Sequence, residues 1–329
     1  MNSFAFTCGD INGIGPEIVV KTLNKIKPSS KRKLIFLCPQ KVFLKTINIV
    51  KPNFKFSIVK SLTQNLENGK VTILDIGSAN QKYGKPSRES GKISYKAIIE
   101  ACNLAKENKV DAIITAPISK VAFKKANINF PGHTELLTDF FNVKKYSMLF
   151  VSDKMKCGLI TIHIPIKNVS KSLTAKKIKN TIDVIINSLK IDFKLKDPKI
   201  SMLGLNPHAG EEGRIGDEEI KILNPILKEY QGRIVGPFVP DAYFGNKLFR
   251  NYDFTIGLYH DQILIPFKLL NFNKGVNFTA GLPIVRTSPD HGTAFDIAGK
   301  GIAIPDSMIE SFKYAELILN NRKSSLERS

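Results

Sequence analysis

All five histidines of this 329-residue chain lie in short polar segments that also contain Gly or Pro. They are His133, His163, His208, His260 and His291. Imidazole is the commonest transition-metal ligand in proteins, and it carries protons near neutral pH. Each of these segments follows an apolar run with the character of a strand, and functional sites are often built on loops held by a rigid framework. The pattern predicts an enzyme with a metal centre or an acid–base centre.

His163, His208 and His260 are the candidate metal ligands, because each follows a β-rich run. Three neutral imidazoles can hold a divalent ion and leave positions open for a substrate oxygen and water. The three lie far apart in the sequence, and the spacing alone also fits loop histidines with ordinary hydrogen bonds. Asp241 and Asp261 are candidate carboxylates near such a centre, with a loop cap or a surface charge as the ordinary alternative.

A candidate anion site lies between Phe267 and Arg286, in a stretch that also carries Gly and Pro. Lys268 supplies a point charge, Asn277 an amide and Arg286 a planar fork of donors, and this combination suits a phosphate or a carboxylate. Lys268 also fits an ordinary surface lysine, since the chain has 41 lysines. Arg286 is more informative because the chain has only 8 arginines.

Two Gly-containing segments are candidate ligand loops. Residues 9–16 form a turn between a strand and a helix, which either receives an anion at the helix N-terminus or is a tight turn without a ligand. This turn matches neither the dinucleotide fingerprint nor the P-loop. In residues 290–305, small residues allow close approach of the backbone to a ligand, and Asp296 could bind ribose hydroxyls.

The elements that must position these residues alternate between short apolar runs and helical patterns. This rhythm predicts a parallel sheet with helices on both faces, and the length favours two α/β domains, one of them discontinuous. The predicted strands are 3–8, 33–38, 71–75, 111–115, 146–151, 157–162, 199–205, 233–235 and 254–258. The predicted helices are 16–27, 91–106, 119–126, 134–141, 175–189, 217–230 and 306–319, followed by a polar tail at 320–329.

Composition narrows the class of partner. The net charge of +20 comes mainly from lysines spread over predicted helix surfaces, which favours a solvated surface over a nucleic-acid footprint. The positive field would help to attract an anionic substrate and cofactor. No apolar run reaches 18 residues, so no membrane span is expected. The four scattered cysteines are expected to be reduced and buried, as in a cytoplasmic protein.

Several sequence strings together carry a resemblance to the 4-hydroxythreonine-4-phosphate dehydrogenase family. The strings are residues 9–17, 115–120, 131–135, 205–211, 258–262 and 286–293. They occur in family order, and the resemblance runs from Thr7 to about Pro305. The segment from His291 to Pro305 is also similar to the adenine-side loop of isopropylmalate dehydrogenase. Two departures touch site loops: the family often has Pro-Ala at residues 11–12, and Gly in place of Ile263.

The resemblance implies a two-domain α/β/α architecture of the isocitrate and isopropylmalate dehydrogenase type, with a cleft between the domains. We expect residues 1–125 plus 272–329 to form a discontinuous α/β domain that carries the NAD loop. Residues 126–271 are expected to form an α/β domain with the metal ligands and the dimer interface.

The resemblance also implies the reaction and the residue roles. The expected reaction is NAD-dependent oxidation of the secondary alcohol of 4-phosphooxy-L-threonine, followed by decarboxylation to 3-amino-2-oxopropyl phosphate in vitamin B6 synthesis. A divalent ion (Zn, Mg or Co) is expected, and its ligands come from both subunits of a homodimer. The expected metal ligands are His163, His208 and His260, and the expected substrate contacts are His133, Thr134, Lys268, Asn277 and Arg286. The expected catalytic residues are Asp241 and Lys268, and the expected cofactor contacts are His291, Gly292, Thr293 and Asp296.

The sequence also leaves two alternative functions open and indicates a cofactor preference. A related dehydrogenase of a 4-phosphorylated sugar acid, of the threonate or erythronate type, fits the same motifs. A non-catalytic, basic nucleotide- or nucleic-acid-binding protein fits the charge, but the clustered motifs argue against it. We expect NAD to be preferred, with NADP possible, because the carboxylate of Asp296 would repel a 2′-phosphate and Lys300 is the nearby cation that could bind one.

Overall fold

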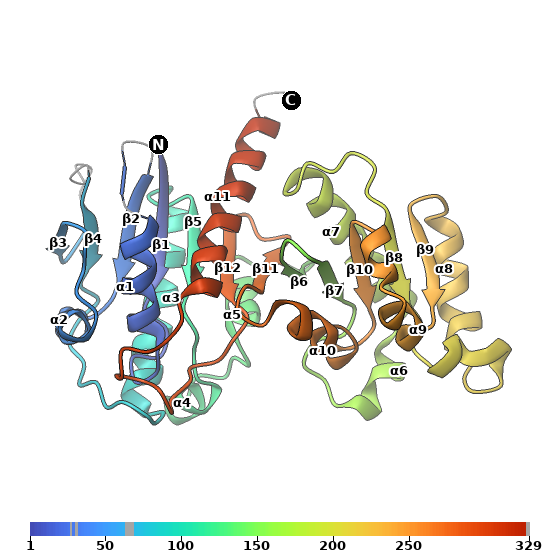
Figure 1. Cartoon of the computed structure of the whole chain (residues 1–329), viewed down its shortest axis with the longest axis horizontal. Helices are drawn as coiled ribbons and strands as arrows, with labels where there is room; N and C mark the ends of the chain where they lie inside the picture. The colour runs from blue at the N-terminus through green and yellow to red at the C-terminus, as the bar shows by residue number, and fades with distance from the viewer. Residues whose placement is uncertain (27, 30–31, 63–68, 327–329) are drawn as a thin grey trace. The chain divides into compact units, whose positions relative to one another are not determined.

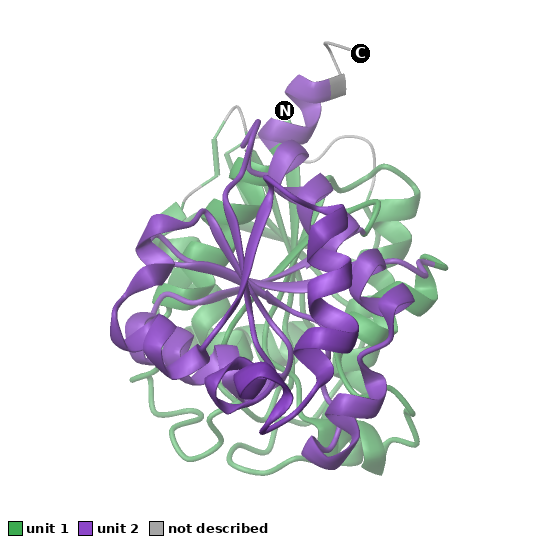
Figure 2. Cartoon of the chain, turned by 90° about the vertical axis from the view of Figure 1, so that its right-hand side faces the viewer, with its two compact units in different colours: residues 1–142, 282–319 green, residues 143–281, 320–329 purple. Residues whose placement is uncertain are grey.

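The computed structural model describes residues 1–26, 28–29, 32–62 and 69–326 (Figure 1). The chain forms two compact units, coloured separately in Figure 2. Unit 1 comprises Met1–Asn142 and Leu282–Leu319, so it is built from two separate segments of the chain. Unit 2 comprises Val143–Gly281 and Asn320–Ser329. None of the described helices is both long and apolar enough to cross a membrane.

Unit 1 has a parallel sheet with the strand order β3-β4-β2-β1-β5-β12. Its strands are β1 (Asn2–Thr7), β2 (Arg32–Leu37), β3 (Phe56–Val59), β4 (Val71–Leu74), β5 (Ala112–Thr115) and β12 (Val285–Pro289). Its helices are α1 (Gly15–Ile26), α2 (Gln40–Ile49), α3 (Arg88–Lys106), α4 (Lys120–Lys125) and α5 (His133–Phe140), followed by α11 (Asp306–Leu326), which extends past the end of unit 1. The central strands are buried on both faces, which explains their continuous apolar character.

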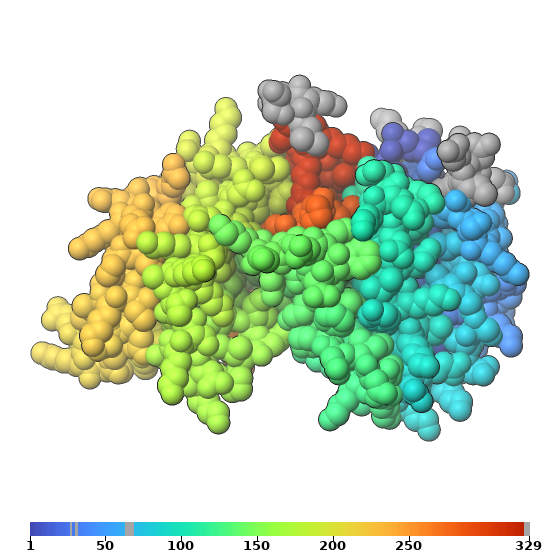
Figure 3. Space-filling model, turned by 180° about the vertical axis from the view of Figure 1, so that it is seen from behind, coloured from blue at the N-terminus to red at the C-terminus, as the bar shows by residue number. Residues whose placement is uncertain are grey.

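Side-chain contacts show which helices cover each face of this sheet. Phe312 of α11 packs against Phe4 and Phe6 of β1, with ring centroids 4.9 and 6.1 Å away. The other face is covered by α3, whose Ser94 donates to the carbonyl of Gly9 just beyond β1. The outer side of α3 is seen in turquoise in Figure 3. Since side chains alternate along a strand, α3 lies over the face that carries Thr7 and Thr115.

Unit 2 has a mixed sheet with the strand order β11-β6-β7-β10-β8-β9. Its strands are β6 (Ser147–Val151), β7 (Lys156–Leu159), β8 (Ile200–Leu203), β9 (Ile234–Phe238), β10 (Phe254–Gly257) and β11 (Val276–Ala280). β6 is antiparallel to β7 and to β11, and the strands from β7 to β9 are parallel. Its helices are α6 (Val169–Ser172), α7 (Ala175–Ile191), α8 (Asn224–Glu229), α9 (Pro240–Gly245) and α10 (His260–Asn271), with further helical turns η1 (Ile166–Asn168), η2 (Pro207–Gly213), η3 (Glu219–Leu223) and η4 (Leu248–Asn251).

The mixed α/β fold is confirmed, but the predicted elements omit several helices and strands, among them α2, β3 and α9. No helix or strand is predicted between residues 259 and 305, whereas the structure has α10, β11 and β12 there. The predicted polar tail is helical as far as Leu326. Polar contacts explain this extension, because Asn321 donates to the carbonyl of Asp192 and Arg322 donates to its buried carboxylate at 2.7 Å.

Candidate functional site

A buried cation lies in the unit 1 sheet, near the start of β12, and its charged group reaches the carboxyl end of β5. Arg286 on β12 is 2% exposed, which is unusual for a side chain that cannot lose its charge readily. Its Nε and Nη2 donate to the hydroxyl of Thr115 at 3.1 and 2.7 Å. Desolvation lowers the pKa of Arg286 to about 9, while the carboxylate of Glu135 acts in the opposite direction. Arg286 is therefore still a cation at neutral pH.

His133 lies beside this cation, and its ring is neutral. Burial lowers its pKa well below the ordinary value, the charge of Arg286 lowers it further, and a hydrogen bond to the backbone of Ala116 acts in the opposite direction. The ring Nε2 is buried and has no hydrogen-bond partner. Since Nε2 is not the atom that bonds to Ala116, Nδ1 carries the proton, and Nε2 is left as a buried acceptor. Such an atom is suited to accept a hydrogen bond from a ligand.

His133 is the first residue of α5, and the helix also positions its neighbours. Gly132 is the N-cap, and its carbonyl accepts from Leu136. Thr134 is buried, and Glu135 in the first turn interacts with Arg286. The prediction that all five histidines lie in loops is therefore wrong for His133. It is also wrong for His260, which is the first residue of α10.

The predicted cofactor loop packs against the turn between β1 and α1. The carbonyl of Thr293 accepts from Ile14, and Glu17 accepts from the backbone of Ala303 at 2.9 Å. Lys21 donates to the carbonyl of Ala303 at 2.6 Å and forms an ion pair with Glu17 at 2.9 Å. These contacts fix the loop near both of its ends, at Thr293 and at Ala303.

The predicted cofactor residues differ in exposure. His291 is half-buried and its Nδ1 lies 3.0 Å from the carbonyl of Gly292, which is itself exposed. Thr293 is half-buried, and Asp296 is exposed together with Lys300. The exposed carboxylate of Asp296 is available to a ligand.

The turn between β1 and α1 is tightly packed. Gly9 has a φ of +63°, and a Cβ atom there would lie 2.4 Å from the carbonyl oxygen of Pro117. A Cβ on Gly15 would lie 2.2 Å from the carbonyl oxygen of Cys8. Glycine is therefore required at both positions on steric grounds. Asn12, one of the departures from the family pattern, is buried here and donates to the carbonyl of Lys85 at 2.9 Å.

In unit 2, His163 and His260 are brought together by strand register. β7 and β10 are parallel, with Leu159 opposite Gly257, so the segments that follow both strands leave the sheet at the same place. The ring centroids of His163 and His260 lie 5.7 Å apart. Nδ1 of His260 lies 2.7 Å from the carboxylate of Asp261. This contact holds the ring through Nδ1, as the hydrogen-bond partner of a metal-binding histidine does.

His208 is presented differently, on a left-handed turn within η2. Residues 208–212 all have φ between +42° and +82°, a conformation that costs about 1–2 kcal/mol per non-glycine residue. Buried Glu219 fixes the start of this turn by accepting from the backbone of Leu205 and Asn206 at 2.7 and 2.9 Å. The His208 side chain is exposed. Strain that is held in place by surrounding contacts often marks a functional segment.

The structure does not assemble the three predicted metal ligands into one group. Within the described ranges, no set of three or more His, Cys, Asp or Glu side chains of the single chain could hold a metal ion. Asp241, the second residue of α9, is exposed. Lys268 on α10 and Asn277 on β11 are half-buried. Sequence proximity placed Lys268, Asn277 and Arg286 together, whereas they lie on three different elements.

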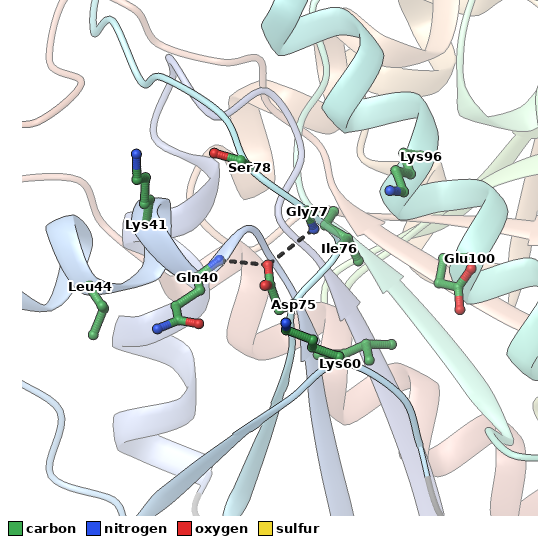
Figure 4. A pocket seen from close by; sticks show the side chains of 11 residues that line it. Gln40, Lys41, Leu44, Lys60, Asp75, Ile76, Gly77, Ser78, Lys96 and Glu100 are labelled. Carbon is green, nitrogen blue, oxygen red and sulfur yellow. Dashed lines mark hydrogen bonds between the residues drawn. The ribbon is translucent and has the colours of Figure 1, made fainter.

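A separate cavity of about 710 Å³ opens in unit 1 (Figure 4). Lys41, Lys60 and Lys96 line it, together with Asp75, which accepts from the backbone of Gln40 and Gly77. None of the predicted site residues lines this cavity. We assign no ligand to it because the only side chain that Figure 4 shows fixed by hydrogen bonds is the acidic one.

Two α/β units, with candidate residues at the carboxyl ends of parallel strands, define an α/β enzyme that binds small anionic molecules.

A family model for the pyridoxal phosphate biosynthetic protein PdxA matches residues 30–315. A 4-hydroxythreonine-4-phosphate dehydrogenase from Sulfurihydrogenibium sp. is 38% identical over 326 residues, covering 98% of this chain and 100% of the relative. A D-threonate 4-phosphate dehydrogenase from Pectobacterium atrosepticum is 38% identical over 319 residues, covering 94% and 97%.

Solved structures of 4-hydroxythreonine-4-phosphate dehydrogenases are also similar to this chain. The crystal structure of 4-hydroxythreonine-4-phosphate dehydrogenase from Klebsiella pneumoniae is similar with a TM-score of 0.83 and 34% identity, covering 97% of this chain and 100% of that one. The chain belongs to the PdxA family of pyridoxal phosphate biosynthetic proteins. It is therefore an oxidoreductase that uses a nicotinamide cofactor.

The state of His133 generates a prediction for pH dependence. Because the folded pKa is depressed, the unfolded chain binds one proton more than the folded chain below pH 6.5. The free energy of unfolding therefore falls as the pH drops below 6.5, by up to about 1.4 kcal/mol per pH unit from this group, until the folded pKa is reached. We expect His133→Gln to reduce this slope in urea unfolding curves measured between pH 7.5 and 5. Equal slopes in the variant and the wild type would show that His133 is not held neutral.

Proposed function

We propose that the protein oxidises 4-phosphooxy-L-threonine at its secondary alcohol with NAD, and that loss of CO2 then gives 3-amino-2-oxopropyl phosphate. The observation that carries this proposal is the buried cation Arg286 beside the neutral acceptor His133. Arg286 can bind an anionic group of a ligand, and His133 can accept a hydrogen bond from a donor group of the same ligand. The substrate named for the relatives carries both kinds of group.

Each substrate contact has a distinct role in this proposal. Arg286 binds an anionic group of the substrate, because a guanidinium holds two oxygens at once. Nε2 of His133 accepts from an ammonium or a hydroxyl group, since a neutral imidazole nitrogen without hydrogen cannot donate. Thr134, Lys268 and Asn277 complete the set with a hydroxyl, a second cation and an amide.

The residues present fit a divalent metal ion. His163 and His260 are neighbours, and Asp261 already orients the ring of His260. Imidazole nitrogen suits zinc and cobalt, whereas magnesium prefers oxygen ligands. When bound, such an ion acts as a Lewis acid that favours deprotonation of an alcohol and stabilises developing negative charge.

We propose that His208 of a second copy completes this metal site, so that the active protein is a homodimer with composite sites. The exposed position of His208 on a strained turn supports this arrangement. So does the finding that the described residues of one chain offer no group of three ligands. A symmetric dimer would form two such sites.

Asp241 and Lys268 are the proposed catalytic residues. The exposed carboxylate of Asp241 can accept a proton, and the half-buried ammonium group of Lys268 can stabilise negative charge or donate a proton.

The loop from His291 to Pro305 is proposed to hold the adenosine half of the cofactor. The contacts of Glu17 and Lys21 support this role by fixing the loop backbone at Ala303. Asp296 is exposed and can accept from ribose hydroxyls, which favours NAD over NADP. When bound, the cofactor accepts the hydride, and the protein positions the alcohol carbon.

Turnover measurements test the reaction and the cofactor preference together. With 4-phosphooxy-L-threonine, NAD and zinc or cobalt, we expect NADH absorbance to appear with a higher kcat/KM than with NADP. D-threonate 4-phosphate is the matched comparison substrate, because it replaces the ammonium group with a hydroxyl. A higher kcat/KM for D-threonate 4-phosphate would contradict the proposed substrate, and a preference for NADP would contradict the role of Asp296.

Complementation between two inactive variants tests the composite metal site. His163→Ala and His208→Ala are each expected to be inactive and to bind less metal while remaining folded. Because one mixed-dimer site would retain all three ligands, mixing the two variants should restore part of the activity. A fully active monomer in light scattering, or no recovery in verified mixed dimers, would exclude a shared site.

A further inference from the structure

We propose that Thr115 is a positioning residue, whose hydroxyl sets the orientation of the Arg286 guanidinium for binding the substrate anion. This inference rests on the proposed function, in which Arg286 is a substrate contact. Thr115 is the last residue of β5 and opens the string Thr115–Lys120. The roles proposed above leave this string without an assignment.

Strand register places the two side chains together. β12 is parallel to β5, with Arg286 opposite Ile113. Side chains of one strand share a face at every second residue, so Thr115 lies on the same face as Ile113 and one repeat nearer the carboxyl end. The long side chain of Arg286 spans this distance. Both side chains are buried, at 2% exposure for Arg286 and 0% for Thr115.

The contact with Thr115 fixes the position of one edge of the guanidinium. Nε and Nη2 of Arg286 share one edge of the group, and both donate to the single hydroxyl oxygen of Thr115, at 3.1 and 2.7 Å. Two donors that converge on one atom hold this edge of the guanidinium against Thr115, and the attachment of Nε to the buried side chain limits rotation about the contact. The other edge, formed by Nη1 and Nη2, is the fork with which an arginine binds two oxygens of a phosphate or carboxylate. Thr115 thus determines where that fork points.

The same segment also fixes the second proposed substrate contact. The backbone of Ala116, the next residue, forms the hydrogen bond that leaves Nε2 of His133 as a buried acceptor. The carbonyl of Pro117 accepts from the backbone of Asp10 at 2.8 Å. The end of β5 therefore orients Arg286 through a side chain and His133 through the backbone.

The chain contains a matched control for the hydroxyl of Thr115. Thr7 lies directly opposite Thr115 on the neighbouring strand β1, and it is equally buried. Its hydroxyl has no hydrogen-bond partner. Replacing either threonine with valine removes one buried hydroxyl from the same face of the same sheet. Only the change at Thr115 removes an acceptor from Arg286.

Steady-state kinetics provide the first test. We expect Thr115→Val to raise KM for 4-phosphooxy-L-threonine by about 10-fold or more, with KM for NAD within about twofold of wild type. Thr115→Ser keeps the acceptor and should restore most of the substrate affinity, whereas Thr7→Val should match the wild type. Arg286→Ala is the reference for complete loss of the contact. A wild-type KM in Thr115→Val, or equal changes in Thr115→Val and Thr7→Val, would overturn the inference.

A second measurement separates this inference from the proposed function. In protein with 15N-labelled arginine, the Nε–H signal of Arg286, assigned by its absence in Arg286→Lys, reports its hydrogen bond without any substrate. We expect slow solvent exchange in the wild type and Thr115→Ser, and faster exchange in Thr115→Val. Unchanged exchange in Thr115→Val would overturn the positioning role. If wild-type enzyme fails to oxidise the substrate while exchange behaves as expected, the proposed substrate is wrong and the positioning role stands.

Discussion

A guanidinium that is 2% exposed is the constraint around which the carboxyl end of the unit 1 sheet is organised. Removing a charge from water is costly unless hydrogen bonds and opposite charge compensate. The hydroxyl of Thr115 and the carboxylate of Glu135 provide that compensation for Arg286. A desolvated cation interacts with an anionic ligand more strongly than an exposed lysine does, because water screens it less. The net charge of +20 attracts anions in general, whereas this one buried side chain can select among them.

In both units, the register of parallel strands sets the positions of the candidate site residues. In unit 1 the register of β5 and β12 brings Thr115 to Arg286, and in unit 2 the register of β7 and β10 brings His163 to His260. Side chains carried by strand ends and by the first turns of helices are held more rigidly than side chains in the middle of a loop. His208 is the exception, since a strained turn fixed by Glu219 presents it at the surface.

The sequence was sufficient to predict the fold class and the family, because the motif strings are specific and occur in order. Arg286 could also be predicted as an anion-binding residue, because arginine is rare in this chain. Local patterns failed where structure depends on distant partners. The strand β12 reads as part of a loop region containing Gly and Pro, yet it pairs with β5. The role of Thr115 depends on a residue 171 positions away, and no local signal could indicate it.

Dependence on distant parts of the chain also explains why the local structure around the histidines was not predicted. His133 and His260 follow apolar runs, but both begin helices, and the neutral state of His133 results from burial and from the nearby charge of Arg286. The left-handed backbone at His208 cannot be predicted from side-chain types such as Ala209 and Glu211, which ordinarily avoid that conformation. The roles of the metal ligands therefore remain predictions from the family motif, supported by the pairing of His163 with His260.

The central claim is that the oriented, buried guanidinium of Arg286 recognises the substrate anion. Calorimetric titration of the cofactor-free protein with 4-phosphooxy-L-threonine tests it most directly, with the wild type compared with Arg286→Lys. Lysine keeps the charge but loses the planar fork, so we expect the dissociation constant to rise by about 10-fold or more. An unchanged dissociation constant in a folded Arg286→Lys protein would contradict the account.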